Sequence, residues 1–496
     1  MNSRIHFYEC KLLVLPWNIG SYFPLNKNFL FVYENLSISQ MKKAGYLIFP
    51  LFLCSCQDEE VTSLNNVSND PSDVVVELNA DALYNENHTI KPSEAEQFAI
   101  TSAKALFNDK NNGLKSARTL KVSGISVLKS PKSSLKSGSV ELPDTLAYFV
   151  NFEDNNGWAY ISADDRVKNP LLAIFEFGNY NSETISEIPG LKALLDNAEH
   201  YMVDEITTFE KYKEVALNEC GNTLKRKKKD KIVTYNGTFD ELEDISNFKL
   251  VTTTWGQSGK YGKYCPKCSS CGKTKLAGCV ITAYAQILAY WENPSKIGNY
   301  DMNWSAMKAN RSIDNVSTTA QEQIAHLMAE LGTMNETDYH CSSCEGKGST
   351  TYDFVEKFSR DYLVYKCGYG FKYKDLNKNS IGSEIVNYLK ANPYPAIVSS
   401  GGHQWIIDEF ATYTPYAYTI VINLTKGTTV SENHWQTGPR TTYFHHNWGW
   451  GGEGNGFFSQ NVFQPNRAES YDYTASSNSK NYLTGNTYFR LYSYWR

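Results

Sequence analysis

The sequence predicts an α+β protein with two folded units, and three patterns carry this prediction. Apolar residues recur at helical spacing over 279–291, apolar and polar residues alternate like a hairpin over 146–162, and glycines divide the aromatic C-terminal half into short strand-like runs. The length of 496 residues exceeds one ordinary domain, and 41% hydrophobic with 20% charged residues is typical of globular protein. A net charge of -5 gives no reason to expect a nucleic-acid partner.

The first residues are interpreted as targeting sequence. Residues 1–40 show no clear period, so we expect a non-native upstream extension, with Met41 as the true start. Two lysines at 42–43 and the apolar run 44–53 have the charged and hydrophobic regions of an export signal, and the run is too short for a permanent membrane helix.

The signal, 41–56, ends in Leu-Cys-Ser-Cys, which resembles the lipobox of bacterial lipoproteins. That resemblance implies lipidation of Cys56, and the acidic run 57–60 resembles signals that send lipoproteins to the surface of some Gram-negative bacteria. We expect an exported protein that a lipid anchors to the outer membrane or cell surface, or that is released after activation. A plain cleaved signal peptide is the alternative.

A polar linker over 57–83 is expected to lead into a small α+β unit over 84–212. Its predicted elements are a helix from Pro92 with acids in its first turn, a hairpin of 146–152 and 158–162 across an Asn-Asn-Gly turn, a strand over 171–177 and a helix over 191–209.

A basic linker over 213–245 is expected to separate this unit from the second, which covers 246–496. Its basic run consists of Lys225, Arg226, Lys227, Lys228 and Lys229. Behind an export signal, such a run is better explained as a solvated site for activating proteolysis than as a nucleic-acid site.

Cys279 is the strongest candidate for chemistry. Gly278 breaks the chain just before the helical pattern and Pro294 stops it, so Cys279 lies on the first turn of the predicted helix. The unpaired N–H groups and the positive end of the helix dipole favour a thiolate there. Taken alone, Cys279 is better explained as a small buried structural residue, and the residues around it decide the interpretation.

A cysteine nucleophile also needs a base, a group that orients the base, and donors for the oxyanion. His403 follows Ser-Ser-Gly-Gly and opens a strand-like run, which makes it the best placed histidine. Asn447 could accept the imidazole N–H and fix its tautomer, while Trp448 and Trp450 shield that contact from water. Gln257 could donate its amide to the oxyanion beside the N–H of the nucleophile.

Four motifs in this order resemble the streptopain family of papain-like cysteine peptidases. They are W-G-Q at 255–257, A-G-C-V-x-T-A-x-A-Q-I at 277–287, G-G-H-x-x-x-I-D at 401–408 and H-N-W-G-W-G-G-x-x-x-G-F-F at 446–458. The separation of Cys279 from His403 is also of the papain-like kind.

The resemblance implies a papain-like peptidase of two subdomains, a helical part that carries the Cys and an antiparallel β part that carries the His and Asn. It implies Cys279 as nucleophile, His403 as general base and acid, Asn447 as the orienting residue and Gln257 as oxyanion donor. No cofactor or metal is implied. Residues 84–212 are similar to the family's inhibitory propeptides.

Two departures concern the site. Asp408 is followed by Glu409, where relatives usually have Gly, and His445 precedes His446, where one histidine is usual. We expect Glu409 to add negative charge near the substrate cleft, and His446 stays a rival base.

A third departure is a group of cysteines: Cys265, Cys268, Cys271, Cys341 and Cys344. Two C-x-x-C pairs could form a zinc site, with the fifth cysteine or His340 to spare. Disulfides are the expectation in an exported protein, and we favour disulfides or partly free thiols because the family brings no metal. Stoichiometric zinc in purified protein would overturn this preference.

The function expected is therefore a secreted or surface-anchored cysteine endopeptidase made as a zymogen. Its partners would be protein or peptide substrates, its own N-terminal unit as inhibitor, and a membrane through the lipid anchor. The alternatives are a catalytically silent surface lipoprotein that uses the fold for binding, and an enzyme that transfers an acyl group to an amine. Substrate preference is not predicted.

Overall fold

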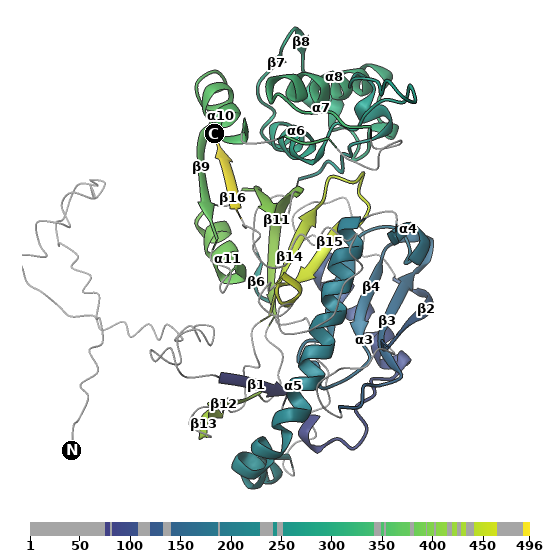
Figure 1. Cartoon of the computed structure of the whole chain (residues 1–496), viewed down its shortest axis with the longest axis vertical. Coiled ribbons are helices and arrows are strands. Elements are labelled where there is room, and N and C mark those ends of the chain that lie inside the picture. Colours follow the sequence, from purple (N-terminus) through teal and green to yellow (C-terminus); the bar gives the residue numbers. More distant parts are fainter. Residues whose placement is uncertain are drawn as a thin grey trace, which may run out of the picture. The chain divides into compact units, whose positions relative to one another are not determined.

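The fold is built around a long antiparallel sheet with helices on both of its faces (Figure 1). The computed structural model describes residues 75–79, 82–107, 120–131, 140–186, 189–228, 242–245, 251–341, 349–351, 354–376, 381–392, 394–400, 403–413, 419–423, 428–432, 441–463 and 490–496. The predicted upstream extension, the signal with Cys56, Lys229 and Cys344 lie outside these residues. Within the described part, no helix is long and apolar enough to span a bilayer.

The elements up to the basic run are β1 (Val75–Asn79), η2 (Ala82–Tyr84), α3 (Pro92–Leu106), β2 (Val122–Lys129), β3 (Thr145–Phe152), η3 (Glu153–Asn155), β4 (Trp158–Ser162), β5 (Leu171–Phe175), α4 (Ser182–Ser186) and α5 (Pro189–Lys228). The hairpin β3–β4 and the starts of α3 and β5 confirm the sequence predictions.

The helical elements after the basic run are η5 (Gly259–Gly262), α6 (Cys279–Trp291), α7 (Trp304–Met307), η6 (Ile313–Asn315), α8 (Thr318–Met334), α10 (Phe354–Phe358), the π-helix η7 (Ser359–Val364), α11 (Ile381–Ala391) and η8 (Gln460–Phe463). The strands are β6 (Leu242–Ile245), β7 (Lys296–Ile297), β8 (Tyr300–Asp301), β9 (Gly370–Asp375), β10 (Ala396–Ser400), β11 (His403–Tyr413), β12 (Thr419–Asn423), β13 (Thr428–Glu432), β14 (Thr441–Asn447), β15 (Gly456–Ser459) and β16 (Arg490–Trp495).

The main sheet has 11 strands in the order β2-β3-β4-β5-β15-β14-β11-β10-β16-β9, and β6 pairs with β11 beside this path. Strands from the predicted first and second units therefore share one sheet, through the pairing of β5 with β15. Residues Asn65–Arg496 form one compact unit. Mixed helix and antiparallel sheet confirms the α+β class, with the Cys on a helix and the His and Asn on strands.

Two segments that the sequence predicts as linkers contain secondary structure. Val75–Asn79, inside the predicted first linker, forms β1 and pairs with β12. Helix α5 continues beyond the predicted end at 209 to Lys228, so 213–228 is helical. Residues 210–220 contain three Glu and two Lys, which are good helix formers, and no Pro or Gly, so the helix continues past 209.

Helix α6 packs against β11 and α8 and is almost wholly apolar. Its side chains join a core with the chain around Trp255, α8 and the C-terminal strand. The start of this helix is thereby fixed relative to the strand that His403 opens.

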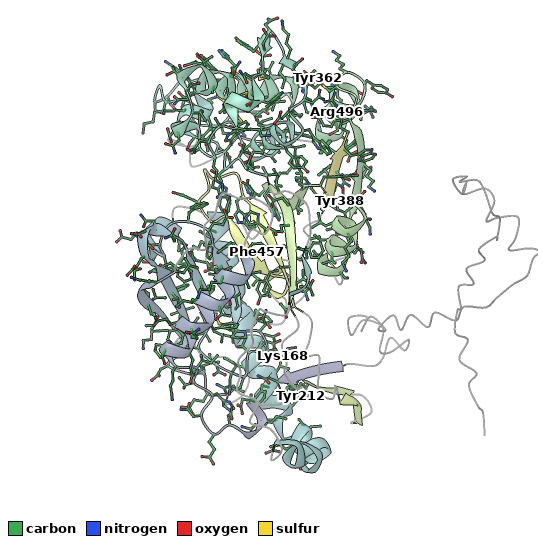
Figure 2. The ribbon with its side chains drawn as sticks, turned by 180° about the vertical axis from the view of Figure 1, so that it is seen from behind. Lys168, Tyr212, Tyr362, Tyr388, Phe457 and Arg496 are labelled. Carbon is green, nitrogen blue, oxygen red and sulfur yellow. A yellow bond between two sulfur atoms is a disulfide. The ribbon has the colours of Figure 1, made fainter. Side chains whose placement is uncertain are left out.

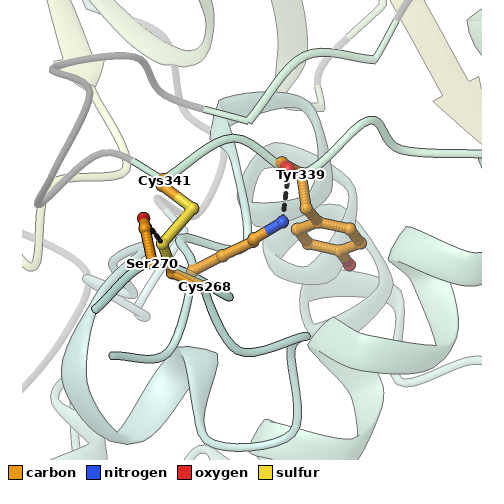
Figure 3. Close-up of a disulfide and its surroundings, with 5 residues drawn as sticks. Cys268, Ser270, Tyr339 and Cys341 are labelled. Atoms are coloured by element: carbon orange, nitrogen blue, oxygen red, sulfur yellow. Dashed lines mark hydrogen bonds between the residues drawn. A yellow bond between two sulfur atoms is a disulfide. The ribbon is translucent and has the colours of Figure 1, made fainter. Parts of the chain in front are cut away.

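A disulfide ties the chain just before α6 to a distant loop (Figure 3). Cys268 bonds to Cys341, and Cys271 is also disulfide-bonded, whereas Cys265 is a buried reduced thiol. The Lys275 ammonium donates to the Tyr339 carbonyl at 2.8 Å beside this bond. These observations agree with the preference for disulfides over zinc.

We predict that the double variant Cys268→Ser and Cys341→Ser loses about 4 kcal/mol of unfolding free energy, because a loop across 73 residues regains its freedom in the unfolded chain. Urea denaturation without reductant measures the loss. Cys367→Ser, which removes a reduced thiol, is the control and should change the value by less than about 1 kcal/mol. Equal stability of the double variant and the wild type would contradict the prediction.

Candidate active site

The site begins at the first turn of α6, as the sequence predicts. Gly278 is the N-cap and has a φ of 97°, a left-handed conformation in which an L side chain would be strained. The thiol of Cys279, the next residue, is half-buried and is not in a disulfide. Glycine is therefore required so that Cys279 can open the helix.

One face of α6 carries Cys279, Thr282 and Gln286, which are spaced three and four residues apart. The Gln286 side-chain oxygen accepts hydrogen bonds from the Trp255 N–H at 3.0 Å and from the Thr253 hydroxyl at 3.1 Å. The segment with the W-G-Q motif is thus bound to the same helix face as the thiol.

Asn447, at the end of β14, is also bound to this face. Its amide donates to the Thr253 carbonyl at 2.7 Å and to Gln286 Oε1 at 3.1 Å. Its oxygen accepts from Gln286 Nε2 at 3.3 Å and from the Gly449 N–H at 3.4 Å. Two donated and two accepted bonds use the full capacity of a carboxamide, so Asn447 connects strand to helix.

His403 obtains its hydrogen-bond partner from the residue next to Asn447. The ring nitrogen Nε2 lies 3.2 Å from the carbonyl oxygen of Trp448. A carbonyl only accepts, so Nε2 carries the proton and Nδ1 is the basic nitrogen. In this structure the tautomer-fixing contact expected of the Asn447 side chain is made by the Trp448 main chain.

Aromatic rings surround His403. The centroids of Trp450, Trp405 and Trp448 lie 5.2, 5.8 and 6.2 Å from that of the imidazole, as stacked rings. Only 5% of His403 is exposed. Burial lowers its pKa from 6.5 to about 4, although the contact with Trp448 acts in the opposite direction. The imidazole is therefore neutral at physiological pH in this conformation.

Gln257 contacts both the segment before α6 and the loop after β14. Its backbone carbonyl accepts from the Ala277 N–H at 2.9 Å, and its side-chain Nε2 donates to the Gly449 carbonyl in a long bond of 3.4 Å. The preceding Gly256 packs so closely that a Cβ there would lie 2.9 Å from the nitrogen of Gly451. The glycines of the W-G-Q and W-G-W-G-G motifs thus allow the two chains to meet.

His445, His446 and Glu409, where this sequence departs from the family's motifs, lie on the paired strands β11 and β14. His445 Nδ1 lies 2.5 Å from Asp408 Oδ1, and both side chains are buried. His446 Nδ1 accepts from the Trp405 indole at 2.8 Å, and burial together with the charge of His445 lowers its pKa well below 6.5. Glu409 is opposite His445 in the strand pairing.

The structure joins Gln257 to the segment just before α6, Asn447 to Gln286 of α6, and His403 to Trp448 and Trp450. The bend at 401–402 before His403 lies outside the described residues. Sequence reasoning missed the role of Gln286, although a polar residue on an apolar helix, seven positions after the thiol, was a usable signal. Among the described residues, no three His, Cys, Asp or Glu side chains form a group that could hold a metal ion.

Residues 255–458 match the sequence profile of the Peptidase C10 family. Streptopain of Streptococcus pyogenes serotype M1 is 24% identical over 223 residues, which cover 39% of this chain and 48% of streptopain. The thiol protease/hemagglutinin PrtT of Porphyromonas gingivalis is 25% identical over 239 residues, which cover 42% of this chain and 23% of PrtT. The match thus spans about half the length of streptopain and about a quarter of the length of PrtT.

Two solved structures are also similar. Prevotella intermedia prointerpain A is 19% identical with a TM-score of 0.42, and the match covers 75% of this chain and 98% of that chain. Active wild-type interpain A of the same organism is 20% identical with a TM-score of 0.32, and the match covers 50% and 94%. The sequence matches confirm the resemblance described above: residues 255–458 are similar to the Peptidase C10 family of cysteine peptidases.

Proposed function

We propose that this chain is a cysteine endopeptidase that hydrolyses peptide bonds through a thioester of Cys279. The observation that carries the proposal is the hydrogen bond between His403 Nε2 and the Trp448 carbonyl, which makes Nδ1 the basic nitrogen. It occurs on the strand that packs against α6, whose first residue is the thiol, within the matched region.

In the proposed reaction, the Cys279 sulfur attacks the peptide carbonyl and its proton passes to His403 Nδ1. The backbone N–H of Cys279 and the Gln257 amide stabilise the oxyanion. His403 then protonates the leaving amine as the C–N bond breaks, and a thioester remains. Water, deprotonated by His403, attacks the thioester, and the acid and the thiol are released.

His403 is a better candidate for this base than its rival His446. His446 already accepts the Trp405 indole N–H on Nδ1, and burial together with the charge of His445 opposes its protonation. The His403 Nε2 proton is donated to a backbone carbonyl, so Nδ1 is its basic nitrogen.

The proposal includes export and latency. Residues 41–56 support export with a lipid on Cys56, and the basic run Lys225–Lys229 supports activating cleavage. Residues 84–212 would act as the inhibitory pro-domain, since β5 joins the sheet of the peptidase domain directly. Protein or peptide chains are the substrates, and no cofactor takes part.

We predict that an epoxide inhibitor of cysteine peptidases labels Cys279 in activated protein and not in Cys279→Ala, and that only the unsubstituted protein cleaves casein. His403→Ala should lower kcat/KM by about 10⁴-fold or more, and Gln257→Ala should lower kcat by about 10²-fold. Mass spectrometry and a casein assay are the measurements.

Other outcomes identify the alternatives. If neither labelling nor casein cleavage occurs after removal of residues 84–212, the binding lipoprotein is favoured. If the acyl group passes to an added amine in place of water, the enzyme is an acyltransferase.

We further propose Gln286 as a positioning residue, because it holds both Trp255 and Asn447 on the face of Cys279. Gln286→Met should lower kcat about 10-fold to 100-fold with KM nearly unchanged, since small misplacements of reacting groups are costly. Tyr284→Phe is the control, because it removes buried hydrogen bonds to Ser359 and Tyr494 away from the site. A loss of stability in both variants with no kcat difference between them would refute the role.

The depressed pKa of His403 predicts acid sensitivity. The pKa of His403 is about 4 in the folded protein and 6.5 in the unfolded chain. The folded state therefore has its full unfolding free energy above pH 6.5 and loses part of it as the pH falls toward 4, because the unfolded chain binds the proton first. Between pH 7 and 5, wild type should lose about 2 kcal/mol more unfolding free energy than His403→Asn, which keeps a donor for the Trp448 carbonyl but cannot titrate. Urea denaturation at the two pH values measures this, and parallel pH curves would exclude it.

A further inference from the structure

The junction between residues 84–212 and the peptidase domain is a true strand pairing. Phe175, Ile174 and Ala173 of β5 are opposite Gly456, Phe457 and Phe458 of β15. Figure 2 labels Phe457 at this position in the sheet. The two segments are thus joined by the same backbone hydrogen bonds that hold each of them together.

The pairing requires the glycine of the G-F-F motif. A Cβ at Gly456 would lie 2.1 Å from the carbonyl oxygen of Ile174, closer than any real contact. The glycine therefore serves the approach of β5.

Both faces of the sheet continue as hydrophobic core across the junction. On one face, Leu172 and residues of α5 pack in the same cluster as Phe444 and Phe458. On the other face, Ala99 of α3 and Ile174 share a cluster with Phe457 and Tyr443. Burial of this kind is typical of the interior of a domain, and it gives the junction a large apolar driving force.

Buried polar groups cross the junction with their partners. The Tyr443 hydroxyl lies 2.8 Å from Asn169 Oδ1, and Asn169 donates to the Ser459 hydroxyl at 3.1 Å. Separation of the segments would leave these groups without their partners, which is costly for buried polar groups.

A buried ion cluster completes the junction. Glu176, which follows β5 and is only 4% exposed, lies 3.0 Å from the Arg311 guanidinium and 3.4 Å from His445 Nε2. Burial alone would lower the pKa of His445, but Asp408 and Glu176 raise it to about 10, so the ring is cationic at neutral pH. Glu176 thus pairs with Arg311 and adds a second carboxylate beside His445, which Asp408 contacts from the peptidase domain.

We propose that residues 84–212 remain bound to the peptidase domain after the basic linker is cut, with Glu176 as the anchor of this interface. The inference rests on the proposed function and extends its regulation: cleavage alone does not release the inhibitor, and activation needs a second step that degrades or displaces residues 84–212.

The test uses the full chain with Cys279→Ala, which cannot digest itself, and with the site of a sequence-specific protease inserted after Asp230. After cutting, the two fragments should co-elute in size-exclusion chromatography at neutral pH. Glu176→Ala should raise their dissociation constant about 100-fold or more, because it removes the carboxylate that pairs with Arg311 and one of the two carboxylates beside His445. If the alanine variant does not fold, Glu176→Gln, which has nearly the same shape, replaces it in the same measurement.

Asp196→Asn is the matched control. It removes a carboxylate from a half-exposed pair with Lys192 on α5, and it should leave the dissociation constant unchanged. Fragments that separate without any substitution, or a Glu176 variant that binds as tightly as the control, would overturn the proposal. Because the experiment needs no catalysis, a failed peptidase assay with co-eluting fragments would count against the proposed function alone.

Discussion

The pair of hydrogen bonds between the carboxamides of Gln286 and Asn447 is the contact on which the site depends. It joins the helix that begins at the thiol to the strand end that leads to Trp448, whose carbonyl sets the tautomer of His403. Both amides are buried and each makes four hydrogen bonds, so neither can turn without losing several bonds at once. The position of α6 relative to the strand end beside His403 is therefore set in part by these two carboxamides.

Close backbone approach is the second constraint. Gly256 must lie against Gly451, Gly278 must adopt a positive φ, and Gly456 must admit the carbonyl of Ile174. Each glycine serves a different contact: between two loops, at the start of a helix, and between two strands of distant origin. Substitution at any of these positions would displace backbone, which a rotamer change cannot repair.

Much of this could be predicted from sequence because the signals are local or compositional. The helix from Cys279 and the hairpin of β3 and β4 follow from periodicity, and the order of motifs gave the family. The Trp448 carbonyl could not be found this way, because every residue has one and only the fold selects it. The continuous sheet and the partners of Glu176 depend on contacts between residues far apart in the chain, which local patterns do not encode.

The bond between Cys268 and Cys341 has a consequence for where the molecule can work. The chain reaches Gly278 ten residues after Cys268, and the hydroxyl of Ser349, eight residues after Cys341, donates to the Leu276 carbonyl. The disulfide therefore helps to place the segment that leads to Gly278. A copy that stayed in a reducing cytoplasm would have the same residues without this covalent tether, so the placement of this segment depends on the redox state of the compartment as well as on folding.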